Sequence, residues 1–523
     1  MESDIGYSSQ GELLKAAYDA FGILPRKEAG GSSFSEKEKK TMQKRLDRLT
    51  KEEGELSENY GQLVSSLSYW LTDILPWPAL IQAIGDVLSD FQECYTDLLR
   101  QDGSYLSKRQ TNQYFISTRA VPLLVLGLHR SRLRCTAEVF WMQMPEDRYW
   151  FLPDIDQHKG MSLPLSKVMR WAYAKCGVSQ TQFHFPGRGP NAENYELQNN
   201  LDNAANWLHS KTLPSLPALL KNFKESFAAL ADRGQAVPPE TQVSLYALLL
   251  FSRFSSYVFR ELASAYGESY VAGLCDQFRK FDRYMSYETA EFYREIRPAL
   301  EQAQNAEVEH AIWQKGVVDY WEFFMDKICG VQETLAHAFD IEKGGFSPQL
   351  VDDLKRRYGL FPVNYALHPM QVPRDFEPSE QFFTLLAQGF ELKRRGGLRL
   401  EQIDQYEADI KEKEVYAQLD WLADWLRAIF YYRQEDYKAA MPHYRSAFAK
   451  AKYRAGQSQY KLVNEYVEVA AKNGKRLWFK QGIAWAQYLG IQIRWLRVRI
   501  PANVTGHSGD RDRFAHGLHA GTG

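Results

Sequence analysis

The chain has 523 residues, of which 45% are hydrophobic and 14% aromatic, so it can bury a large core and wholesale disorder is excluded. Its 64 Lys and Arg residues nearly balance 65 Asp and Glu residues, which excludes a polycation and confines any basic surface to a local region. At roughly 100–200 residues per domain, this length predicts three or four structural units.

The cysteine pattern and the first residues predict where the protein resides. The five cysteines are scattered, and no two form a CxxC pair that would indicate a zinc or thioredoxin-like site. Scattered thiols in a large chain are typical of a reducing compartment. The polar start of the chain differs from a secretory signal, and the apolar run over 120–128 is too short to span a bilayer. We therefore expect a cytoplasmic protein without a membrane partner.

The first 115 residues have the character of a helical region. A short amphipathic helix is predicted over 11–22, and a strongly charged helix over 38–61 that presents Leu46 and Leu49 on one face. A further helical region over 73–99 is interrupted near Pro76.

A small β-hairpin is predicted near 120–153. The apolar run 120–128 has β-branched character, and residues 134–142 partly alternate between apolar and polar. The turn chemistry of Pro145–Asp147 follows, and then the aromatic segment 149–152.

Helical periodicity returns at Pro164 and continues almost to the end of the chain. Long helices are predicted over 240–266, 276–304 and 308–339, and residues 380–500 are again almost purely helical. The fold class we expect is therefore mainly α, with one minor β-hairpin. The predicted regions are 1–115 (helical), 116–235 (hairpin and helical segment), 236–343 (long-helix bundle), 344–379 (Pro/Gly-rich linker), 380–500 (helical domain) and 501–523 (flexible tail).

The segment 165–223 resembles the helix-turn-helix of phage repressors of the XRE type. A helix over 167–175 is followed by Gly177 as a C-cap and Ser179 as an N-cap, and Trp207 and Pro214 resemble the end of that family's recognition helix. This chain departs from the motif by an insertion of about ten residues around 186–196. The other interpretation is that Trp207, Leu208 and Pro214 are core and helix-terminating residues of a helical domain.

The resemblance implies DNA binding by side chains of the two helices. Amide side chains suit adenine edges and lysine suits phosphate or guanine. Residues 101–190 carry 12 Lys and Arg against 6 Asp and Glu, a local excess of the sign that DNA requires. The predicted DNA-binding residues are Gln180, Thr181, Gln182, Asn203, Asn206 and Lys211.

The segment 426–451 resembles a tetratricopeptide (TPR) repeat, a helical hairpin of about 34 residues. Ala428, Tyr431, Tyr437 and Tyr444 occupy positions where that repeat has small or aromatic residues. Trp425 is one position from the usual site and the closing proline is absent. A generic helical bundle is the alternative.

Repeats of this type bind protein or peptide partners, and the charge distribution favours an acidic partner. Residues 441–500 carry 12 Lys and Arg against 2 Glu, with Trp478, Phe479, Trp485 and Trp495 interspersed. Single-stranded nucleic acid is a second ligand that this composition suits, and a core of Trp residues beneath a solvated cationic face is the structural alternative. The predicted partner-binding residues are Tyr431, Lys475, Arg476, Lys480 and Arg494.

No catalytic, cofactor or metal signature is complete in this sequence. Glu307 and His310 form one ExxH pair, whereas a di-iron bundle needs two. Glu333 and His337 are spaced as a local helical pair, and the basic segment 511–516 lies in a Gly-rich tail. We therefore expect no cofactor, no metal and no catalytic residues.

The sequence as a whole predicts a helical regulatory or interaction protein that is not an enzyme. In this hypothesis the central segment binds DNA and the TPR-like region binds a partner. The alternatives are a pure protein–protein scaffold, such as an adaptor of a bacterial conflict or immunity system, and an enzyme whose site leaves no motif.

Overall fold

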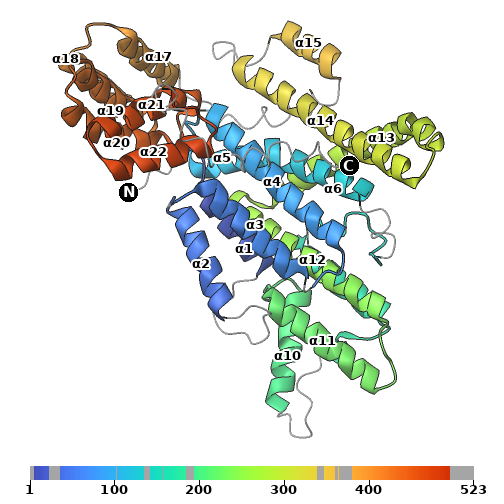
Figure 1. Ribbon diagram of the computed structural model, residues 1–523. Coiled ribbons are helices and arrows are strands. Elements are labelled where there is room, and N and C mark those ends of the chain that lie inside the picture. The colour runs from blue at the N-terminus through green and yellow to red at the C-terminus, as the bar shows by residue number, and fades with distance from the viewer. Residues whose placement is uncertain are drawn as a thin grey trace, which may run out of the picture.

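The computed structural model describes residues 5–22, 36–134 apart from 53, 73 and 102, 142–183 apart from 157 and 159, 194–338, 347–359, 363 and 380–494. Within these residues the protein is mainly α-helical, with one small two-stranded antiparallel sheet (Figure 1). The expected fold class is therefore confirmed.

The N-terminal part consists of packed helices. Ser9 begins the first one with a capping box to Glu12, and Gly22 ends it at φ 67°, a left-handed conformation that glycine adopts without strain. The predicted helix over 38–61 is two helices, because Glu52 and Gly54 both have positive φ and reverse the chain. The helices are α1 (Gln10–Phe21), α2 (Glu36–Thr50), α3 (Leu56–Thr72), α4 (Pro78–Gln101), α5 (Lys108–Phe115), a π-helical turn (Ile116–Ala120) and α6 (Val121–Arg134).

The predicted position of the hairpin is wrong. Residues 120–128 are helical, and their apolar run reflects a helix buried on nearly every side between α4 and the later helix α13. The sheet instead pairs β1 (Asp154–Asp156) with β2 (Gly160–Ser162), with Ile155 opposite Met161. Residues 135–141, which make up most of the second predicted strand, lie outside the described residues.

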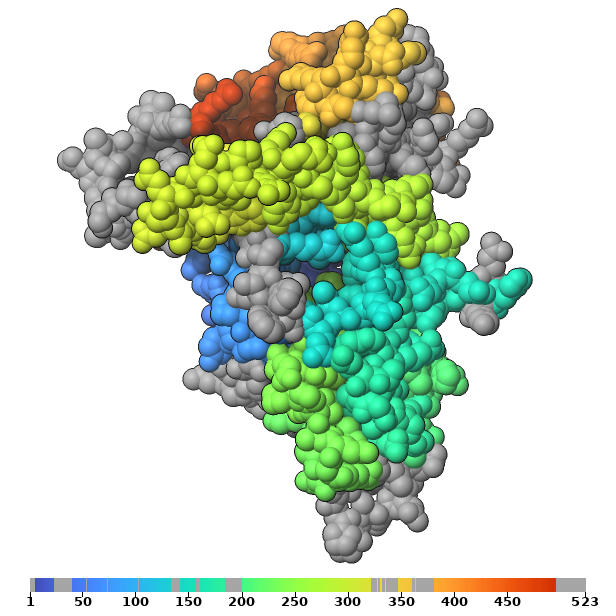
Figure 2. All heavy atoms as spheres, turned by 90° about the vertical axis from the view of Figure 1, so that its right-hand side faces the viewer, coloured from blue at the N-terminus to red at the C-terminus, as the bar shows by residue number. Residues whose placement is uncertain are grey.

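The middle of the chain contains short helices followed by very long ones. The short helices are α8 (Pro164–Lys175), α9 (Gln180–Phe183), α10 (Asn194–Leu208) and α11 (Leu216–Asp232). Three long helices follow, α12 (Pro239–Tyr266), α13 (Glu268–Glu301) and α14 (Ala306–Ala338), and then the short helix α15 (Pro348–Tyr358). The three long helices confirm the predicted helices over 240–266, 276–304 and 308–339. The α13–α14 pair forms the yellow-green band that lies across the cyan α6 region (Figure 2).

The C-terminal part is an array of three helical hairpins, which we call the hairpin array (residues 380–494). Each pair of consecutive helices is joined by a few residues and packs together, as in αα-hairpins. The helices are α17 (Glu380–Arg394), α18 (Leu400–Glu412), α19 (Tyr416–Arg433), α20 (Tyr437–Ala451), α21 (Gln459–Lys472) and α22 (Arg476–Tyr488).

Two hairpins of the array share one turn geometry. The Asp436 N–H donates to the Tyr431 carbonyl oxygen in the α19–α20 turn, and the Lys475 N–H donates to the Ala470 carbonyl oxygen in the α21–α22 turn. Glu435 has φ 60° and its counterpart Gly474 has φ 64°. The turns are therefore repeated units, although their sequences differ.

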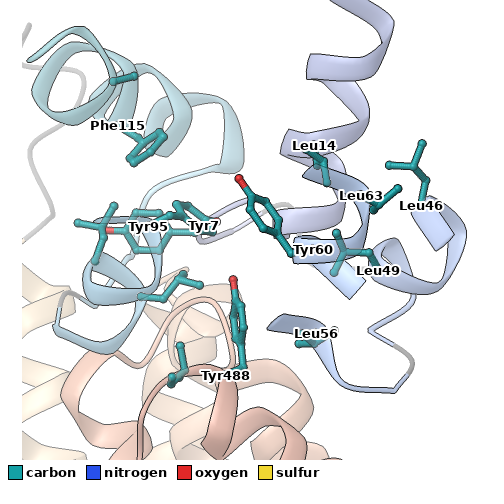
Figure 3. Packing of buried hydrophobic residues seen from close by; sticks show 14 of the residues in the cluster. Tyr7, Leu14, Leu46, Leu49, Leu56, Tyr60, Leu63, Tyr95, Phe115 and Tyr488 are labelled. Carbon is teal, nitrogen blue, oxygen red and sulfur yellow. The ribbon is translucent and has the colours of Figure 1, made fainter. Parts of the chain in front are cut away.

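The hairpin array and the N-terminal helices share one hydrophobic core. Buried side chains from Tyr7 to Ile493 belong to a single cluster, and Figure 3 shows Tyr488 of α22 pointing toward Tyr60 of α3. We call the polar border of this core the seam. In the seam Lys452 pairs with Glu52, the Tyr453 hydroxyl donates to Glu52 at 2.5 Å, and Gln459 donates to the Leu99 carbonyl oxygen at 2.9 Å.

Candidate partner-binding surface on the hairpin array

The cationic side chains after residue 440 divide into paired and unpaired groups. Lys450 and Arg454 bind Asp420 at 3.1 and 3.0 Å, and Lys452 binds Glu52. Lys461 and Lys472 pair with glutamates one turn away on their own helix. Among the described residues, no ion pair involves the rest of the set: Arg445, Lys475, Arg476, Lys480 and Arg494.

Three of the unpaired cations lie in the first turns of α22 and its cap. Arg476 and Lys480 are exposed and one turn apart, with Leu477 between them at 67% exposure. The opposite face of α22 is buried through Gly482, Trp485 and Ala486. Because α22 is the last described helix of the array, its cationic outer face is covered by no other described helix.

Trp478 joins the cations of two helices. The Arg445 guanidinium of α20 lies 5.0 Å from the Trp478 ring centroid, and the Lys475 ammonium lies 5.5 Å from it. The ring is half-buried against the core, whereas Trp485 is buried and donates from Nε1 to Gln459 Oε1 at 2.9 Å. The two tryptophans thus differ: Trp485 is core, and Trp478 lies at the surface between cations.

The predicted partner-binding residues do not all gather in one place. Lys475, Arg476 and Lys480 are neighbours at the start of α22, and Tyr431 lies near the equivalent α19–α20 turn, where its ring stacks on His443 at 5.6 Å. Burial lowers the pKa of the His443 imidazole, so it stacks as a neutral ring at pH 7. Arg494 lies beyond the far end of α22, where its N–H donates to Asn464.

The sequence analysis does not identify Arg445 as part of this cationic surface, because Arg445 reaches Trp478 only through the tertiary fold. It also misses a largely buried cluster formed by four helices of the array. There Lys393 Nζ lies 3.3 Å from the Trp425 ring centroid, and Trp425 Nε1 and the Tyr444 hydroxyl donate to the same oxygen of Glu465. Loss of solvation lowers the pKa of Lys393 to about 8. No sequence spacing links these residues, which come from α17, α19, α20 and α21.

The predicted helix-turn-helix segment forms part of the helical core. Gly177 has φ 65° and turns the chain into α9, which has a single turn. The Gln182 side chain accepts from the Ser179 N–H at 2.9 Å and so caps this turn. Phe183 is fully buried against Phe223 and Phe227.

The predicted DNA-binding residues differ in exposure. Thr181, Gln182 and Lys211 are exposed, whereas Gln180, Asn203 and Asn206 are half-buried. Trp207 is buried, as expected if it is a core residue of a helical domain. The insertion at 186–196 falls largely outside the described residues, and DNA binding by this segment stays a prediction.

Of the enzyme-like pairs in the sequence, only Glu307 and His310 have side chains among the described residues. Glu307 and His310 are both exposed on α14. The side chains of Glu333 and His337 and the segment 511–516 lie outside the described residues. No group of His, Cys, Asp and Glu among the described residues is arranged to hold a metal ion.

Two further findings concern the described helices and the similarity of the chain to known proteins. None of the described helices combines the length and the apolar character needed to cross a membrane. No family model, no curated protein and no solved structure matches this chain.

Proposed function

We propose that this chain is a non-catalytic interaction protein whose hairpin array binds an acidic protein or peptide partner. The observation that carries the proposal is the division of its cations. Those needed to hold the array together are neutralised by Asp420, Asp424 and Glu52, while those at the start of α22 have no counter-charge among the described residues.

The chemistry of this surface suits a partner with carboxylates beside apolar groups. Arg476 and Lys480 supply charges that steer and orient an anion, and Leu477 and Trp478 supply apolar area close by. Exposed cations spaced one turn apart also repel each other, and an acidic segment relieves this repulsion. The DNA-binding half of the hypothesis stays a prediction for Gln180, Thr181, Gln182, Asn203, Asn206 and Lys211. The Gln182 side chain is engaged as a cap in this structure.

A titration of the full chain with a labelled peptide of alternating Glu and Phe tests the proposal. The double variant Arg476→Glu/Lys480→Glu replaces two charges that attract an acidic peptide by two that repel it, at two exposed positions. We expect its affinity for this peptide to fall at least tenfold, and the wild-type affinity to weaken as salt rises from about 50 to about 200 mM. Fluorescence polarisation measures both effects.

Lys221→Glu/Lys224→Glu is the matched control, because these two lysines are also exposed, helical and about one turn apart on α11. The control should bind like the wild type. Equal loss in both double variants would show that net charge alone matters and would refute the surface. Selective loss of binding to a labelled DNA probe in the α22 variant would assign the surface to nucleic acid instead.

A further inference from the structure

A buried carboxylate holds basic side chains from two other segments of the chain, α6 and the turn at 147–152. Asp282 of α13 is 1% exposed, and its Oδ1 lies 3.0 Å from Nε2 of His129 and 3.5 Å from a guanidinium nitrogen of Arg132. Its Oδ2 accepts a hydrogen bond from the Tyr149 hydroxyl at 3.0 Å and forms an ion pair with Arg148 at 2.7 Å. The carboxylate on α13 is therefore bound by groups from α6 and from the turn at 147–152.

The inner side of this cluster is closed and rigid. His129 is 3% exposed, and its Nδ1 lies 3.1 Å from Thr289 Oγ1, which in turn lies 2.8 Å from the Tyr320 hydroxyl on α14. A substrate has no access to His129, so the His–Asp pair holds neighbouring groups in place and is not positioned for catalysis.

The outer side of the cluster is open and strongly cationic. Arg132 and Arg148 are 43% and 45% exposed. The Arg279 guanidinium lies 5.6 Å from the Tyr149 ring centroid, and Arg283 is exposed one turn further along α13. The nearby carboxylate of Asp147 is bound by Lys167 at 2.9 Å. Arg132 and Arg148 thus share the single carboxylate of Asp282, and Arg279 and Arg283 add two guanidinium groups close to Tyr149.

The electrostatics agree with this geometry. Burial alone raises the pKa of the Asp282 carboxyl, but the hydrogen bond from His129 and the charges of Arg148 and Arg132 outweigh it and lower the pKa to about 2. Burial lowers the pKa of Arg132, and the charge of Arg148 lowers it further against the attraction of Asp282. The arginines therefore repel one another, and one carboxylate does not neutralise them.

We propose that Arg132 and Arg148, with Arg283 beside them, bind a phosphate group, and that Asp282 is a positioning residue that orients the two guanidinium forks. Contacts among the described residues use one guanidinium nitrogen of Arg132 and one of Arg148, which leaves N–H donors on each fork for phosphate oxygens.

The strand of a single-stranded nucleic acid is the phosphate source that the surroundings favour. Tyr287 is 64% exposed and lies one turn beyond Arg283 on α13, so a base can stack on its ring while phosphates bind the arginines. Free nucleotides share the phosphate chemistry. The site lies on α6 and α13 and is independent of the partner surface on α22.

The test is a polarisation titration of the full chain with labelled oligo-dT, repeated at several salt concentrations and with ATP and inorganic phosphate as competitors. Arg148→Gln removes a charge at the carboxylate, and Arg283→Gln removes one without touching Asp282, so the second variant remains informative if the first disturbs the fold. Arg297→Gln is the control, because Arg297 lies on the same helix, is 76% exposed and pairs with Glu301.

We expect Arg148→Gln and Arg283→Gln each to weaken oligo-dT binding at least fivefold and to reduce the slope of log K against log salt by about 0.7, as the loss of one phosphate contact requires. Arg297→Gln should change neither quantity. If ATP competes with an affinity equal to that of oligo-dT, the phosphate site is supported and its ligand is a free nucleotide. Absence of binding to every probe, unchanged slopes in both variants, or loss of binding in Arg476→Glu/Lys480→Glu would overturn the proposal.

Discussion

Two buried tyrosines differ in how their hydroxyl groups are satisfied. The Tyr18 hydroxyl donates to the Leu63 carbonyl oxygen at 2.8 Å, whereas the Tyr488 hydroxyl has no hydrogen-bond partner among the described residues. Tyr18→Phe is expected to lower the free energy of unfolding by about 1 kcal/mol. The Tyr488 hydroxyl loses its hydration on folding and gains no hydrogen bond in return. Tyr488→Phe should therefore leave the free energy of unfolding within about 0.5 kcal/mol of the wild type or raise it. Urea unfolding midpoints compare the two variants, and the reverse order would contradict this assignment.

At the level of elements, the repeated turns of the hairpin array make a second prediction. Gly474 at φ 64° has no atom within 4 Å of an added Cβ, so Gly474→Ala tests backbone strain alone. Its cost is expected to be about 1 kcal/mol. Glu435 occupies the equivalent position at φ 60° and already bears that strain, so Glu435→Gly should cause no loss and gain up to about 0.5 kcal/mol. Chemical denaturation of both variants measures the difference, and similar losses in both would refute the equivalence of the two turns.

Local signals predict local elements well, and fail where a helix is buried on all sides. Ser9, Glu12 and Gly22 mark the limits of α1 in the sequence itself. Residues 120–128 have no such limits, and their apolar run has the same pattern for a buried strand as for a buried helix. Arg130 and Arg132, which alternate as in a strand, lie on α6 and bind Asp90 and Asp282 on different helices.

The candidate sites are less predictable than the elements, because their residues meet only through tertiary packing. The cationic excess of the C-terminal region is visible in the composition. Which cations are neutralised depends on partners as remote as Glu52 for Lys452. Likewise, His129 and Asp282 are 153 positions apart, and no spacing in the sequence connects them.

At the scale of the whole molecule, the seam predicts that the N-terminal helices and the hairpin array are stabilised together. Glu52 binds both Lys452 and Tyr453, so Glu52→Gln replaces a carboxylate that accepts from two partners. We expect a loss of about 1–3 kcal/mol and faster amide exchange in both α3 and α22. Hydrogen-exchange mass spectrometry measures each side, with Glu58→Gln on exposed α3 surface as the control. Faster exchange confined to α2 and α3 would show that the two parts are stabilised separately.

The same seam has a consequence for synthesis on the ribosome. The partners Glu52 and Lys452 are 400 positions apart, and Tyr7 and Tyr95 share a core with side chains of α22. At about 5–20 residues per second, roughly 20 to 80 s pass between the emergence of the two sides of this core. Throughout that interval the part of the apolar surface of α3 and α4 that packs on the array lacks this partner, although α6 and α12 already cover other parts of the N-terminal helices. We therefore expect the nascent chain to keep this part of its apolar surface exposed, where a chaperone can bind it, until the last hairpin leaves the exit tunnel.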